Sequence, residues 1–542
     1  MVQHRQKERE GISYPDYVRR LATASPMYTA LHNFLQDKTH SSQSPVKATV
    51  AVIPPTSLDK SSSSLRFKEC SGTVELSEEL ELSKSTEGTC RLFIVENVCA
   101  QTITLLGEHF KIDPQFFADH VSNEPWYRIE NVAERLPPLP SSQKLHAFLQ
   151  LRYIETRTLW SIGTMSDDAD CGEGGVEPVH SERVNAPDLE AAPDSTSDTR
   201  SYMLPDRITT RIPRKAGKLI PRVRKDKEFE PLLCTRQAVT VWFEKVDAGM
   251  KGWNGIVLLD PPFQLPGGDQ YCMPTGYRSF ARRPSLLDNS DDLTLPTSNR
   301  EAFARQLKQR YMHVPELLEV ARQDSFLFLT DLYRLIASNW VVINEYVNRE
   351  LATIEYILEK EEPGFQELEI FLKDLYIYRR RLVKYHELIT EAKDHCNKRG
   401  QLSWARDLTS GLAIEYASET EGDFTYLQGK TQGTTQRIEK NISLLASLVP
   451  IEAGKQSLVD SHGIAKLTLL AIIFVPFATI ASILGMEGEF SPSGKYFWVF
   501  WIVALLLSGV IFGISALDGG FASKVLVSVL MRCPLMSRIR KM

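Results

Sequence analysis

Two carboxylates stand in the short segment SILGMEGEF, residues 482–490, which separates two long apolar runs near the C-terminus. Glu487 and Glu489 lie where a membrane protein would reverse direction between two spans. Rings of acidic side chains select for cations in channels. The pair therefore predicts an ion mouth, with Glu487 as the residue that contacts the metal. The alternative is a polar turn made by Gly485 and Gly488, in which the acids only keep the turn in water.

The apolar runs on either side have the length of membrane spans. Residues 467–486 carry no charged side chain, and residues 496–517 repeat this pattern. About 20 apolar residues cross a hydrocarbon core of roughly 30 Å. We therefore expect an integral membrane protein in contact with the lipid bilayer, with transmembrane helices at 465–486 and 496–517 and an outer loop at 487–495.

Basic residues are distributed unevenly about these two spans. The outer loop offers Lys495 alone, whereas the tail at 518–542 is basic. The tail contains Lys524, Arg532, Arg538, Arg540 and Lys541. Because Lys and Arg favour the inner side of a membrane, both termini should face the cytosol. The choice between a plasma and an organelle membrane stays open.

One face of the first span carries small or moderate side chains at every third or fourth position. This small-residue face consists of Ser461, Ile464, Thr468, Ala471, Val475, Ala478 and Ser482. The opposite side carries bulky residues such as Phe474, Phe477 and Ile480. A helix that lines a pore is sorted in this way, and so is a helix that packs closely against a neighbour through small residues.

The chain before the spans has the pattern of a cytosolic α/β domain. Its strand patterns predict a mostly antiparallel sheet. We expect an N-terminal extension at 1–85 and the domain itself at 86–300. Insertions at 161–215 and 265–298 are too polar to bury a core and should be disordered. The overall composition, with 24% charged residues and a net charge of -5, gives no support to a nucleic-acid partner.

Helical periodicity begins near residue 300. Two runs of about 35 residues, broken apart at Gly364, predict a long helical hairpin within 301–422. A stalk helix should follow at 423–464 and lead into the first span. The sequence contains no nucleophile elbow, phosphate-binding loop or zincin motif, so an enzyme is not expected.

The residues of the first span resemble those of a known family. The run LTLLAIIFVPFATIASILGME is similar to the signature of the CorA-like divalent-cation transporters, which ends in Gly-Met-Asn. Gly485 and Met486 match this signature, whereas Glu487 stands in place of the asparagine. The segments IDPQFFADHV and DFTYL are similar to the fungal branch of the family.

The resemblance implies a homopentamer with cytosolic α/β domains, stalk helices and an axial pore lined by the first span. It implies Mg²⁺ or another divalent cation as the transported ion, with no permanently bound cofactor. A neutral amide suits Mg²⁺, which sheds water reluctantly, so carboxylates at the mouth predict slower flux and broader selectivity. The alternative is a transport-deficient CorA-like membrane protein whose cytosolic domain serves protein interaction.

The charge asymmetry makes a testable prediction about topology. A Phe490→Cys variant should react with an impermeant maleimide from outside intact cells, because the loop at 487–495 faces outward. An Arg540→Cys variant should react only after permeabilisation, because the basic tail faces inward. Labelling of the two variants is compared on immunoprecipitated protein. The reverse pattern would show that the orientation is inverted.

Overall fold

The computed structural model describes most of the chain, in two compact units. The described residues are 12–37, 47–55, 64–85, 88–122, 140–143, 146–161, 212, 216–219, 232–246, 252–261, 270–274, 296, 298–360, 363–483 and 494–518. The first unit comprises residues 1–362 and 373–442, and the second comprises residues 363–372 and 443–542.

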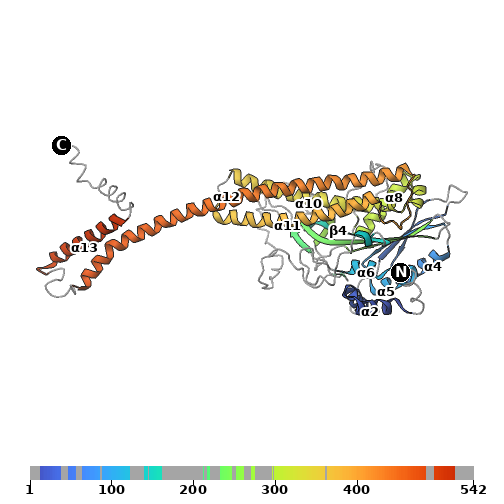
Figure 1. Ribbon diagram of the computed structural model, residues 1–542, viewed down its shortest axis with the longest axis horizontal. Helices are drawn as coiled ribbons and strands as arrows, with labels where there is room; N and C mark the ends of the chain where they lie inside the picture. The colour runs from blue at the N-terminus through green and yellow to red at the C-terminus, as the bar shows by residue number, and fades with distance from the viewer. Residues whose placement is uncertain are drawn as a thin grey trace, which may run out of the picture. The chain divides into compact units, whose positions relative to one another are not determined.

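The first unit is built on one eight-stranded sheet, shown in Figure 1. Its strands are β1 (Lys47–Ile53), β2 (Arg66–Cys70), β3 (Cys90–Glu96), β4 (Phe148–Ser161), β5 (Ala216–Leu219), β6 (Leu232–Lys245), β7 (Trp253–Leu259) and β8 (Gln270–Pro274). The order is β2-β1-β3-β7-β6-β4-β8, with β5 paired to β6. Strands β3 and β7 run parallel, and the other described pairs are antiparallel. The sheet is thus mostly antiparallel, as the strand pattern predicts.

Short helices cover one face of this sheet. They are α2 (Tyr14–Ala24), α3 (Thr29–Gln36), α4 (Thr73–Ser85), α5 (Ala100–Phe110) and α6 (Pro114–Val121); the four-residue α7 (Pro140–Gln143) precedes β4. Alternate strand residues such as Val50, Phe93 and Ile256 are fully buried in one apolar cluster with side chains from α2–α6. Because successive strand residues point to opposite faces, the remaining apolar residues of β3 and β7 serve the other face.

Longer helices cover that other face. They are α8 (Asn299–His313), α9 (Leu317–Gln323) and α10 (Phe326–Lys360). Trp253 joins them to the sheet: its indole Nε1 donates to the Ala321 carbonyl at 2.9 Å, and its ring meets Phe328 edge-on at 5.3 Å. Asn339 of α10 accepts a hydrogen bond from the Thr156 backbone of β4 at 3.0 Å. The first unit is therefore a three-layer α/β/α domain.

The next two helices are α11 (Phe365–Lys398) and α12 (Gly411–Ile483). Helices α10 and α11 occupy the region predicted as a helical hairpin, and Trp340 of α10 lies 5.2 Å from the ring of Tyr385 in α11. In the first unit, α12 packs beside α10 (Figure 1). Paired residues of α10 and α12 stay between 82 and 87 positions apart along the chain, so these two helices run parallel.

The contact between α10 and α12 is a polar seam. Thr431 Oγ1 lies 3.2 Å from Asn344 Oδ1, and both residues are buried. Nearer the end of α10, Arg437 Nε and Asn441 Nδ2 each donate to Glu355 Oε1 at 2.8 Å. The hydrogen bond from Arg437 lowers the pKa of Glu355 below its ordinary value. Buried polar groups without partners are costly, so this seam fixes one register between the two helices.

The turn between α11 and α12 is fastened to the sheet by Trp404. The Trp404 side chain is fully buried, its Nε1 donates to the Ala147 carbonyl at 2.7 Å, and its ring meets Phe243 at 4.8 Å. Gly400 lies under the ring with a φ of 77°, in the left-handed region that favours glycine. A Cβ at Gly400 would stand 2.2 Å from the Trp404 ring.

Several predicted boundaries differ from the structure. The predicted N-terminal extension at 1–85 instead supplies β1 and β2, because β1 pairs with β3 along its whole length. Inside the predicted insertions, Ile212 is buried in the core and β8 pairs with β4; most of the remaining insertion residues lie outside the described part. The stalk helix begins at Gly411 rather than at 423, since its first turns pack beside α8 and α10.

One described helix, α10, is long and apolar enough to cross a membrane, and most of its apolar stretch is buried inside the domain. The last helix, α13 (Phe497–Asp518), carries a shorter apolar stretch at Phe497–Val510. The first predicted span corresponds to the end of α12, and several of its side chains lie outside the described residues. The two spans expected at 465–486 and 496–517 therefore stay a prediction.

The Trp404 turn leads to a stability prediction. Gly400→Ala should destabilise the full chain by about 2 kcal/mol or more, because it adds about 1–2 kcal/mol of left-handed strain and forces a tightly held ring to move. Gly422→Ala is the matched control, since nothing lies within 4 Å of a Cβ there. It should stabilise α12 by about 0.5–1 kcal/mol. Tryptophan fluorescence during thermal unfolding in detergent measures both. Equal effects of the two variants would contradict the role of the turn.

Candidate functional site

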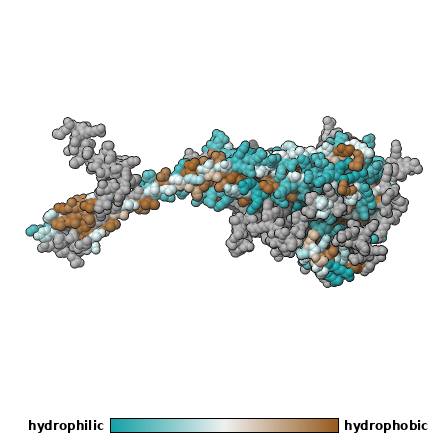
Figure 2. Space-filling model, viewed as in Figure 1, coloured by the Kyte–Doolittle hydropathy of each residue, from teal (hydrophilic) through white to brown (hydrophobic). Residues whose placement is uncertain are grey.

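The second unit contains the end of α12 and the helix α13, which pack against each other. Ile480 of α12 is buried with Phe500 and Ala504 of α13, and Phe477 packs against this cluster. The Phe477 ring lies 6.1 Å from the Phe500 ring and 5.9 Å from the Trp501 ring. Figure 2 shows apolar side chains gathered on these two helices. The bulky side of α12 therefore faces α13.

The small-residue face lies on the other side of α12. All seven of its members, from Ser461 to Ser482, are described and exposed. Each residue of an α-helix is turned about 100° from the last, so this face is directed away from Phe477 and Ile480. Exposure alone does not distinguish the small-residue face from the rest of α12, because Phe474 is also 62% exposed. The contacts with α13 show which side of α12 is the packed one.

The small-residue face follows a seven-residue repeat. One series reads Gly454, Ser461, Thr468, Val475 and Ser482, and the other reads Ser457, Ile464, Ala471 and Ala478. Gly454 and Ser457 extend the predicted face toward the N-terminus, and both are exposed. Residues that recur every seven positions stay on the side that faces the partner helix when two helices wind around each other with a left-handed twist. The spacing is typical of a helix that contacts another helix along this face.

The predicted mouth residues Gly485, Met486, Glu487 and Glu489 lie outside the described residues. Their geometry is therefore not part of the observed site, and the role of Glu487 stays a prediction. Within the described part of the chain, no group of three or more His, Cys, Asp or Glu side chains is arranged to hold a metal ion.

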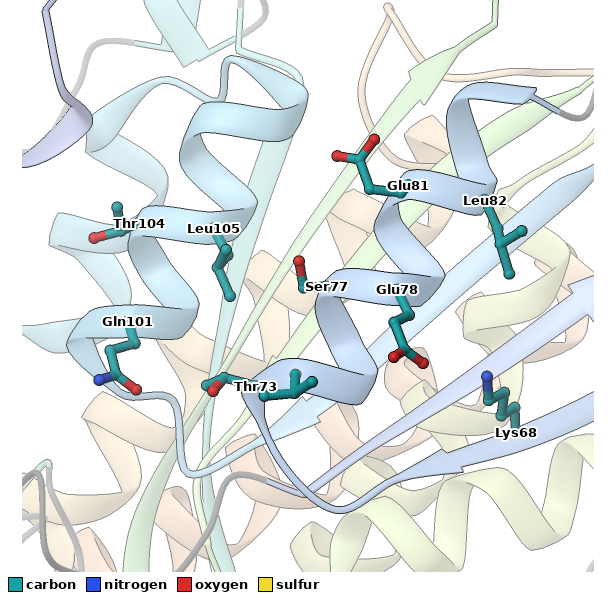
Figure 3. A pocket seen from close by; sticks show the side chains of 10 residues that line it. Lys68, Thr73, Ser77, Glu78, Glu81, Leu82, Gln101, Thr104 and Leu105 are labelled. Carbon is teal, nitrogen blue, oxygen red and sulfur yellow. The ribbon is translucent and has the colours of Figure 1, made fainter.

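An open groove of about 980 Å³ lies on the α/β domain between α4 and α5 (Figure 3). Leu82 and Leu105 line it together with Glu78, Glu81 and Lys68. The predicted ion-path residues belong to α12 and the loop after it, and none of them lines this groove.

The comparisons with known proteins bear on the region that carries the site. Residues 293–517 match the family described as CorA-like Mg2+ transporter protein, which is about two-fifths of the chain. The matched region runs from α8 to α13 and includes the small-residue face. Residues 293–517 are thus similar to a family of Mg2+ transporter proteins.

One solved structure with similarity to the chain is titled the complete structure of the CorA magnesium transporter from Methanocaldococcus jannaschii. It shares 15% sequence identity with this chain, and the match covers 55% of this chain and 80% of that one, with a TM-score of 0.25. No curated protein matches the chain.

The two sides of α12 make a prediction about contacts between copies. Ser482→Cys should form disulfide-linked dimers far more readily than Phe477→Cys under mild oxidation, because Ser482 lies on the repeat and Phe477 packs on α13. Oxidised membranes are compared by non-reducing electrophoresis, with the native cysteines replaced. Preferential linkage through Phe477→Cys would show that the wrong side of α12 has been assigned to the contact.

Proposed function

We propose that the protein is a CorA-like transporter that conducts divalent cations, with Mg²⁺ as the first ion to test, through an axial pore of a homo-oligomer. The observation that carries this proposal is the family match over residues 293–517, which contains α12 and α13. The seven-residue repeat supports it independently, because identical copies of α12 could surround an axis through this face. A pentamer is the assembly that the resemblance implies, and we place the chain in the fungal branch, with Gly-Met-Glu as a variant of the family's Gly-Met-Asn signature.

In this proposal the end of α12 and the helix α13 are the two spans. The bulky aromatic side chains of α13 form an outer ring, and α12 forms the inner one. The packing of Phe477 on Phe500 and Trp501 supports this arrangement, since it leaves the small-residue face free for other copies. The α/β domain and both termini then lie on the inner side of the membrane, consistent with the basic tail.

The small side chains suit a path for an ion that keeps its water. Mg²⁺ demands regular octahedral coordination and loses its waters reluctantly. Hydroxyl groups at Ser461, Thr468 and Ser482 offer neutral oxygen atoms to such waters. Glu487 and Glu489 would then concentrate cations at the outer end of the path before they enter.

The proposal predicts flux in a purified system. The full chain, reconstituted into liposomes that contain a Mg²⁺-sensitive dye, should admit Mg²⁺ down its gradient when the interior is negative. Glu487→Gln should lower this uptake about tenfold at low ionic strength, because focused acidic charge raises the local cation concentration by 10-fold or more. The same variant should weaken block by a second divalent ion such as Ca²⁺.

Lys495→Gln is the matched control, because it removes a charge of the same predicted loop without removing an acid. It should not reduce uptake. An assembled protein that admits no Mg²⁺ or other divalent cation would refute transport and leave the interaction protein as the remaining function. Flux that is unchanged in Glu487→Gln would reduce the acidic segment to a polar turn.

A further inference from the structure

Helix α4 carries apolar side chains on two opposite sides. Leu76 and Leu80 are buried in the core of the α/β domain, whereas Val74 and Leu82 are 72% and 51% exposed. Val74 and Leu82 line the open groove between α4 and α5. A surface helix normally keeps its outer side polar. The outer side of α4 therefore has the composition of a surface that another segment covers.

The two helices that form this groove meet at their C-terminal ends. There Ser83 Oγ of α4 lies 2.8 Å from His109 Nε2 of α5. Leu105 of α5 and Ser77 of α4 point into the space between the helices, and Gln101 lies at the other end (Figure 3). An extended segment can therefore lie along the groove, with one end beside Ser83 and His109.

The lining of the groove is acidic. Glu78 and Glu81 of α4 belong to it, and both side chains are exposed. Lys68 is the one cation among the described residues that line the groove, and its Nζ lies 2.6 Å from the carboxylate of the buried Glu79. The lining and its immediate partner thus carry more negative than positive charge, which favours a basic occupant.

The chain enters α2 next to this groove. The backbone N–H of Tyr14 donates to Glu108 Oε1 of α5 at 3.1 Å, and the Tyr14 hydroxyl donates to the Ile112 carbonyl at 3.2 Å. Glu108 lies four residues after Thr104 and seven after Gln101, so it shares one side of α5 with these two lining residues. The segment that precedes Tyr14 therefore starts one helical turn beyond the groove.

This segment is long enough to follow the groove along its whole length. Residues 1–11 precede Ile12, the first described residue. Glu108 and Gln101 are separated by about 10 Å along α5, and an extended chain covers about 3.3 Å per residue. Three or four residues before Tyr14 thus reach the far end of the groove, and the residues before these can cross to α4.

The composition of the segment matches the groove. Its sequence is MVQHRQKEREG. The first seven residues include Arg5 and Lys7 and no acid, and they begin with the apolar Met1 and Val2. The part of the segment that is farthest from Tyr14 therefore offers the positive charge and the apolar side chains that an acidic groove with exposed leucine and valine would bind.

We propose that residues 1–11 dock along the groove between α4 and α5 of the same chain. Arg5 and Lys7 then lie beside Glu78 and Glu81, and the apolar residues cover the outer side of α4. Little intrinsic affinity is needed, because a short flexible tether gives an effective concentration on the order of mM. The inference concerns the α/β domain and does not rest on the proposed transport function.

Cysteine cross-linking in the full chain tests the docking. With the native cysteines replaced, Gln6→Cys should form a disulfide with Gln101→Cys far more readily than with Arg20→Cys. Arg20 is an exposed position on α2 that lies nearer to Gln6 in the sequence, so it serves as the control. Linked peptides are quantified by mass spectrometry after mild oxidation in detergent. Equal linkage to the two positions would overturn the proposal.

The charge match predicts a loss of linkage and its rescue. Glu78→Lys combined with Glu81→Lys should lower the linkage to Gln101→Cys about tenfold, because two exposed attractions become repulsions. Adding Arg5→Glu and Lys7→Glu to this variant should restore the linkage. Linkage that survives the first pair of substitutions, or that the second pair fails to restore, would overturn the proposal.

Glu415→Lys combined with Glu439→Lys is the matched control for charge. Both acids are exposed on α12, outside the groove, and their reversal changes the net charge by the same amount. This variant should leave the linkage to Gln101→Cys unchanged. An equal loss in both double variants would assign the effect to net charge and overturn the role of the groove.

Mixed assemblies identify which copy supplies the segment. Chains that carry only Gln6→Cys are co-expressed with differently tagged chains that carry only Gln101→Cys. Docking within one chain predicts no disulfide between the two kinds of chain. A linked pair of chains would assign the groove to a second copy and would overturn docking within the chain.

Discussion

The geometry of one uninterrupted helix governs how this protein uses its residues. An α-helix returns to the same side every 3.6 residues, and α12 keeps this geometry from Gly411 to Ile483. In the first unit its inner side is a core surface, where Phe424, Leu427 and Ile438 are buried. In the second unit large residues recur on the side toward α13, and small ones on the other side. The position of a residue in the sequence therefore decides whether it meets a core, a neighbouring helix or open space.

The polar seam between α10 and α12 restricts this helix more than an apolar contact would. Apolar side chains tolerate small shifts, because dispersion and burial are not directional. If α12 moved along α10 by a single residue, the buried Asn344 Oδ1 atom would lose Thr431 Oγ1 as its partner, and an unpaired buried acceptor is costly. The carboxylate of Glu355 binds both Arg437 and Asn441, one turn apart, which marks the same register. Burial of apolar area supplies stability here, and the hydrogen bonds select one alignment of the two parallel helices.

The sequence predicts those parts of the fold in which periodicity is strong. The hairpin of α10 and α11 follows from apolar residues at helical spacing, and β3 and β7 follow from dense β-branched and aromatic runs. Strands β1 and β2 fall within the predicted N-terminal extension because a Ser-rich stretch separates them, and only the structure shows that they pair with each other and that β1 pairs with β3. The start of α12 was placed too late, since Gly411, Gly422 and several Ser and Thr residues lower helix propensity, which packing against α8 and α10 overrides. In the candidate site, the spacing of the small residues predicts one face of α12. Which side of the helix packs against α13 follows only from the contacts of Phe477 in the structure.

A stripe of small, neutral side chains cannot by itself distinguish a pore from a packed seam, because both require helices to approach closely. A charge on the stripe can. Two unit charges of equal sign 4 Å apart repel by about 4 kcal/mol at an effective dielectric constant of 20, and by about 1 kcal/mol in water. Symmetry repeats that repulsion between every pair of neighbouring copies, so a dry seam is penalised several times over, whereas hydration and bound cations remove most of the penalty. Asp460, eleven residues before Ala471, lies on this side of α12, so a dry seam through the small residues would be more costly than their spacing alone suggests.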